Sequence, residues 1–98
     1  MRVTAWLGTA LCLVPLAGCS KPLSQQECYE LLDKYVELLV ASDNPDIPAA
    51  VRLKLKAEAR AKADRDPAFG QCTDRVSRSE FECAMQAGNP DGLEQCLL

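Results

Sequence analysis

The stretch Ser24-Gln-Gln-Glu-Cys-Tyr-Glu-Leu-Leu-Asp-Lys-Tyr-Val-Glu-Leu-Leu39 carries the strongest fold signal in this sequence of 98 residues. Ser24 and Glu27 have the spacing of a capping box, in which each side chain accepts a hydrogen bond from the other residue's backbone amide. The apolar residues after them recur at helical spacing and are Cys28, Leu31, Leu32, Tyr35 and Leu39. The stretch predicts a long amphipathic helix that starts after Ser24 and places Tyr35 in the core. Its solvent-facing residues are expected to be Glu27, Glu30, Lys34 and Glu37.

A second helix is expected over residues 49–64, which are rich in Ala, Lys, Arg, Leu and Glu. The cluster at 42–46 predicts a turn before it, with Asp46 as the helix cap and Pro48 in the first helical turn. This helix is locally basic through Arg52, Lys54, Lys56, Arg60, Lys62 and Arg65. Because these positive charges are spread around the helix, we expect a solvated face rather than a patch for an acidic partner.

Three short helices are expected in the last third of the chain. Asp66-Pro67 begins the first of them, and Ser77 with Glu80 forms a second capping box that begins the next. Gly88 is expected to end that helix, and Asn89-Pro90 to begin the last one. The sequence therefore predicts an all-α bundle of about five helices.

Four cysteines of this helical region are expected to form two disulfides, and they are Cys28, Cys72, Cys83 and Cys96. Four cysteines allow three pairings, which the sequence alone does not resolve. Direction gives a hint, because at about 100° per residue Cys83 points nearly opposite to Phe81 and Met85. Cys72 and Cys96 instead lie on the apolar stripes of their helices, which leaves Cys83 for the first long helix and favours Cys28–Cys83 together with Cys72–Cys96.

Residues 1–18 have the pattern of a secretory signal peptide. Arg2 supplies a positive start, and the run from Val3 to Leu16 is apolar and uncharged but too short to span a membrane. The segment ends in Leu16-Ala17-Gly18-Cys19, and here the sequence resembles the bacterial lipoprotein family, whose lipobox it matches at every position. The resemblance implies cleavage before Cys19 and acylation of that residue. Residues 19–23 would then be a lipidated tether, and 24–98 a helical, disulfide-stabilised domain.

The same resemblance gives an expected location. Ser20 stands after the lipidated cysteine, where an Asp would suggest retention at the inner membrane, so the outer membrane facing the periplasm is favoured. Acyl chains anchor a protein by about 0.8 kcal/mol per buried methylene, and stable anchoring takes more than one chain. The expected partners are therefore the lipid bilayer, through acylated Cys19, and an envelope protein.

Composition excludes several classes of function. The formal net charge of −3 argues against nucleic acid, which favours clustered Lys and Arg. The absence of His removes the commonest general base and metal ligand, and the cysteine spacings contain no zinc knuckle. No nucleophile motif or glycine-rich phosphate loop is present, so we expect neither an enzyme nor a cofactor or metal site.

The Cys-x10-Cys-x12-Cys spacing near the C-terminus, with a cysteine on an upstream helix, resembles small cysteine-patterned lipoproteins of Gram-negative bacteria. That resemblance implies an architecture rather than an activity. We therefore expect a non-enzymatic structural or interaction module of the cell envelope. The alternative is a small binding module that inhibits a periplasmic or secreted enzyme, with residues 42–46 as its projecting loop.

Overall fold

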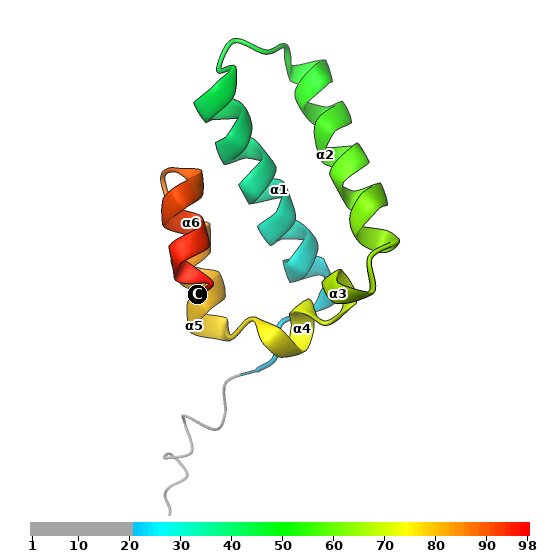
Figure 1. The fold of residues 1–98 in the computed structure, drawn as a ribbon, viewed down its shortest axis with the longest axis vertical. Helices are drawn as coiled ribbons and strands as arrows, with labels where there is room; N and C mark the ends of the chain where they lie inside the picture. Colours follow the sequence, from blue (N-terminus) through cyan, green and yellow to red (C-terminus); the bar gives the residue numbers. More distant parts are fainter. Residues whose placement is uncertain (1–20) are drawn as a thin grey trace, which may run out of the picture.

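A computed structural model describes residues 21–98, in which the chain forms six α-helices (Figure 1). In chain order they are α1 (Gln25–Asp43), α2 (Ala49–Asp64), α3 (Pro67–Gly70), α4 (Cys72–Arg75), α5 (Arg78–Met85) and α6 (Pro90–Cys96). The predicted all-α class is confirmed. The predicted signal peptide, together with Cys19 and Ser20, lies outside the described residues.

The structure has six helices where the sequence predicts about five, because the first short helix is interrupted at Gln71. This residue ends α3 and precedes α4, and its amide donates to the carbonyl of Ala68 instead of continuing the α-helical pattern. A bond to the third preceding residue tightens the last turn of a helix. The chain therefore turns between α3 and α4 and brings Cys72 toward α1.

Side-chain caps fix where most helices begin. Both predicted capping boxes are confirmed: the amide-to-side-chain distances are 3.0 and 3.0 Å between Ser24 and Glu27, and 2.8 and 3.1 Å between Ser77 and Glu80. The Asn89 side chain also accepts from an amide of the first turn of α6. These local contacts can be predicted from the sequence because the capping residue and its partner are only two or three residues apart.

Two predicted helix ends are wrong. Pro48, not Asp46, is the N-cap of α2, and it provides no side-chain cap, so Asp46 lies too far upstream to contact the first turn. At the other boundary, α5 ends at Met85 with Gln86 as its C-cap, before Gly88. The expected turn also shortens, since Ser42 and Asp43 belong to the last turn of α1 and only residues 44–48 connect it to α2.

The core lies on one side of α1. In Figure 1, α1 stands between α2 and the α5–α6 pair, and α3 and α4 lie near its N-terminal end. The clustered buried side chains come from the start of the domain, α1, α5 and α6, and are Leu23, Cys28, Leu31, Phe81, Ala84 and Leu93. In contrast, α2 contributes no buried side chain. The best-packed part of the domain is therefore formed by α1, α5 and α6.

All four cysteines form disulfides, but the predicted pairing is wrong. The bonds are Cys28–Cys72 and Cys83–Cys96, with Cα–Cα distances of 6.2 and 5.7 Å. The α5 helix places Phe81 and Ala84 in the core. Cys83 is exposed, as its position opposite Phe81 on the helix predicts, but it bonds to Cys96 and not to Cys28 of α1. The inference failed because α6 packs beside α5 and brings Cys96 to Cys83, while the break at Gln71 places Cys72 against Cys28.

Candidate binding groove

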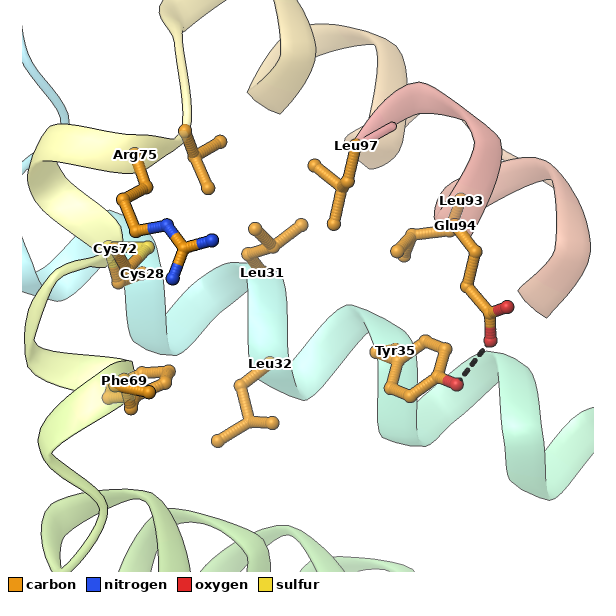
Figure 2. Close-up of a pocket in the computed structure, with 12 residues that line it drawn as sticks. Cys28, Leu31, Leu32, Tyr35, Phe69, Cys72, Arg75, Leu93, Glu94 and Leu97 are labelled. Carbon is orange, nitrogen blue, oxygen red and sulfur yellow. Dashed lines mark hydrogen bonds between the residues drawn. A yellow bond between two sulfur atoms is a disulfide. The ribbon is translucent and has the colours of Figure 1, made fainter.

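Side chains of α1, α3, α4 and α6 line a groove of about 470 Å³, which we call the α1 groove (Figure 2). Its lining residues are Cys28, Leu31, Leu32, Tyr35, Ala68, Phe69, Cys72, Arg75, Val76, Leu93, Glu94 and Leu97. The volume falls within the range of about 300–1,000 Å³ that is usual for ligand sites. The lining is mainly apolar, so the groove is suited to burying an apolar group.

The floor of the groove is continuous with the hydrophobic core. Leu31 and Leu93 are 8% and 2% exposed, and the Cys28–Cys72 disulfide lies at one end. The α1 side of the groove is made by the helical stripe that the sequence predicts, because Leu31 and Tyr35 are four residues apart and share a face. The walls are half-buried apolar side chains, among them Leu32, Phe69, Val76 and Leu97.

One end of the groove carries a hydrogen-bonded carboxylate. The Tyr35 hydroxyl donates to Glu94 Oε2 at 2.5 Å, across 59 positions of sequence. This hydrogen bond to Glu94 raises the pKa of Tyr35 above its usual value of 10.0. Tyr35 does pack against the core as predicted, but its ring also lines the groove.

The other end of the groove carries a cation. Figure 2 shows Arg75 beside Cys28 and Cys72, with its guanidinium toward Leu31. The side chain is exposed, and it forms no hydrogen bond or ion pair with the other residues described. Cys28 and Tyr35 are seven residues apart on α1, which corresponds to about 10 Å or two helical turns. The apolar floor of the groove includes Leu31 and Leu32, which lie between these two residues of α1.

Sequence reasoning missed Arg75 and Glu94 as site residues. Each occupies an ordinary solvent-facing position on a short helix, and nothing in its local sequence distinguishes it from the other charged residues. Their relation to Tyr35 and Cys28 arises only when α4 and α6 pack against α1.

The basic helix α2 is a second candidate surface, and the expectation that its charges are simply solvated is wrong for three of them. Arg60 donates to both oxygens of Asp33, at 3.2 and 2.7 Å, and Lys56 donates to Glu37 at 2.5 Å. Arg52 also lies 3.7 Å from Glu37. These cations attach α2 to α1, which leaves a less basic outer face than the composition suggests.

Two of the predicted solvent-facing acids of α1 take part in ion pairs between helices. Glu37 contacts α2, and Glu27 contacts Arg78 at the start of α5, with the shortest N–O distance 2.5 Å in each case. Hydrogen bonds from these cations lower the pKa of both carboxyl groups, to about 2 for Glu27. The polar side of α1 is therefore an interface between helices as well as a solvated surface.

Within residues 21–98, no three or more His, Cys, Asp or Glu side chains are grouped so that they could hold a metal ion. Over the same range, no helix has both the length and the apolar character needed to cross a membrane. The ionisable side chains of the α1 groove are Tyr35, Arg75 and Glu94, which can pair with charged groups of a ligand at its two ends.

Comparison with family models, with curated proteins and with solved structures finds no match to this chain.

Proposed function

We propose that this protein is a lipid-anchored interaction module of the bacterial cell envelope, which binds an envelope protein in the α1 groove. The observation that carries the proposal is the groove itself, which is apolar along its floor and charged at both ends. Partly exposed apolar side chains gain free energy when a partner covers them, by about 25 cal/mol per Å² of surface removed from water.

The proposed anchor is acylated Cys19, on the outer membrane and facing the periplasm. The lipobox Leu16-Ala17-Gly18-Cys19 supports this assignment, as does the uncharged apolar segment before it. The acidic net charge gives no attraction to anionic lipid, so stable attachment would depend on the acyl chains.

A short tether would hold the domain close to the bilayer. Within residues 21–98, the first buried side chain is that of Leu23, which is 3% exposed and lies four residues after Cys19 in sequence. Four residues of extended chain span at most about 14 Å. Arg78 Nη2 also donates to the Pro22 carbonyl at 3.3 Å, which joins the start of the domain to α5. The α4 end of the α1 groove would then lie nearer the membrane than the Glu94 end.

The proposed function is tested by site-specific photo-crosslinking in living cells. A benzophenone side chain is placed in the groove at Leu32 or Val76, and at exposed Glu58 on α2 as the control. We expect the two groove positions to crosslink to the same envelope protein and the control not to. No adduct, or an equal adduct from the control, would contradict a partner site in the groove.

The anchor is tested separately. Mass spectrometry of the mature N-terminus, combined with membrane fractionation, should find acylated Cys19 in the outer membrane. A Cys19→Ser chain should lose the acyl groups and leave that fraction. An unmodified Cys19 or a wild-type chain in the soluble fraction would contradict the anchor without bearing on the groove.

A further inference from the structure

We infer that the partner occupies the α1 groove with an amphipathic helix that runs parallel to α1, with acidic residues in its first turn against Arg75 and basic residues in its last turn against Glu94. This inference rests on the proposed function, because it specifies the partner element that the groove binds.

The dimensions of the groove suit about two turns of helix. The floor from Cys28 to Tyr35 is about 10 Å long. A helix of that length presents two or three apolar side chains at spacings of three, four and seven residues, which is the usual way a helix binds in a groove. The α3–α4 segment and α6 supply walls on either side of this floor.

The apolar lining favours a helix over an extended segment. Between the charged ends, the side chains that face the groove are hydrocarbon or disulfide sulfur. An extended peptide buried there would need hydrogen-bond partners for its backbone, and leaving those groups unpaired costs free energy. A helix satisfies these groups within itself, apart from its ends.

The charged ends determine the direction of the helix. Arg75 is exposed and has no ion pair among the described residues, and a guanidinium can hold a carboxylate through two parallel hydrogen bonds. Glu94 accepts one hydrogen bond from Tyr35, which leaves lone pairs for a cation. Helices favour acidic residues in the first turn and basic residues in the last. The N-terminus therefore lies at Arg75, and the direction matches that of α1, which runs from Cys28 to Tyr35.

Both walls of the groove are covalently fixed before a partner arrives. Cys28–Cys72 attaches α4 to α1, and Cys83–Cys96 attaches α6 to α5, which packs on α1. A site that is already held in its binding geometry loses less conformational entropy on association. The disulfides therefore support binding as well as stability.

Two synthetic peptides test the direction. Both have Leu at the same helical positions and identical composition, but one has Glu in the first turn and Lys in the last, and the other has the reverse. Each is titrated into the mature chain, residues 19–98 with Cys19→Ser and both disulfides formed, and binding is followed by NMR. We expect the peptide with Glu first to bind about tenfold more tightly, a difference of about 1.4 kcal/mol.

Charge reversal provides the matched variants. Arg75→Glu should abolish or invert the preference, whereas Arg65→Glu, at an exposed arginine outside the groove, should preserve it. A spin label at the N-terminus of the better peptide should broaden the Val76 amide more than the Gln95 amide in the unsubstituted groove. This second measurement does not depend on how the variants fold.

Equal affinity for the two peptides, no binding by either, or an unchanged preference in Arg75→Glu would overturn the inference. Binding of dodecanoate with no peptide binding would identify an acyl chain as the occupant, and would also overturn it. If the groove positions crosslink to a partner in cells but the two peptides bind with equal affinity, the proposed function is supported and this inference is refuted.

Discussion

Glu27 and Arg78 join the start of α1 to the start of α5. Arg78 Nη1 lies 2.5 Å from Glu27 Oε2, and Nη2 lies 3.0 Å from Oε1, across 51 positions of sequence. The same arginine donates to the Pro22 carbonyl, and Glu27 Oε1 also accepts the Ser24 amide of the capping box. The Glu27 carboxylate therefore connects the start of α1 to α5, and the Arg78 that it binds also holds the backbone at Pro22.

Glu27→Gln should lower the thermal unfolding midpoint by several degrees. Gln at this position can still complete a capping box, so the substitution removes mainly the charge that pairs with Arg78. Calorimetry of the wild-type and variant chains measures the change. Glu30→Gln is the control, because Glu30 is exposed on the same helix and forms no ion pair with any described residue. Equal midpoints for the two variants would contradict a stabilising Glu27–Arg78 pair.

Acid should destabilise the domain over a defined range. Hydrogen bonding from Arg78 holds the pKa of Glu27 at about 2, below its ordinary value of 4.5. Because the folded state has the lower pKa, the stabilisation is complete above pH 4.5 and is lost as the pH falls toward 2. Urea unfolding at a series of pH values should show this decline, and Glu27→Gln should make it shallower. Parallel pH profiles for the wild-type and Glu27→Gln chains would exclude Glu27 as a source of the acid-induced loss of stability.

Removing the two disulfides should have unequal effects. The chain-entropy relation gives about 4 kcal/mol for the bond separated by 44 positions and about 3 kcal/mol for the bond separated by 13. Cys28 is also 1% exposed, so its truncation removes buried contacts as well. Cys28→Ala/Cys72→Ala should therefore unfold at lower urea than Cys83→Ala/Cys96→Ala. The opposite order would show that the native contacts of α6 outweigh the entropy term.

A reductant should cleave the Cys83–Cys96 disulfide before the Cys28–Cys72 disulfide. Cys83 is exposed and Cys28 is buried, and thiol–disulfide exchange requires access to a sulfur. Limited reduction of the folded chain, followed by alkylation and peptide mapping, should label Cys83 and Cys96 first. First labelling of Cys28 and Cys72 would indicate that the domain opens at α4 before α6 separates.

The α2 helix should be the least protected long helix. It has no buried side chain, and its contacts with α1 include the ion pairs of Arg52, Lys56 and Arg60. Segments with few buried contacts open at low free energy. Hydrogen exchange should therefore be faster in α2 than in the first half of α1. At 1 M salt, where the Debye length is about 3 Å, the difference in exchange rate between α2 and α1 should increase, because salt screens the ion pairs. Equal protection would contradict this view of the α1–α2 interface.

Contacts between residues close in sequence were predictable, whereas contacts across the fold were not. The two capping boxes follow from serine–glutamate pairs three residues apart, and both are present. The groove depends instead on the packing of α4 and α6 against α1, which places Arg75 and Glu94 beside the face that carries Tyr35. No local sequence pattern predicts that packing. The wrong disulfide pairing has the same origin, because the direction of Cys83 was inferred correctly but its neighbouring helix was not.

The sequence by itself determined the helical class, the two capping boxes, the apolar stripe of α1 and the four cysteines available for pairing. The stretch Leu16-Ala17-Gly18-Cys19 resembles a lipobox and predicts an anchor at Cys19, which lies outside the described part of the chain. Only the tertiary structure decided which sulfurs meet, which acids of α1 pair with Arg60 and Arg78, and that a groove forms beside Tyr35. The physical reason is the separation in sequence over which each interaction acts. Helix periodicity and caps act within a few residues, whereas disulfides, ion pairs between helices and grooves depend on how whole helices pack.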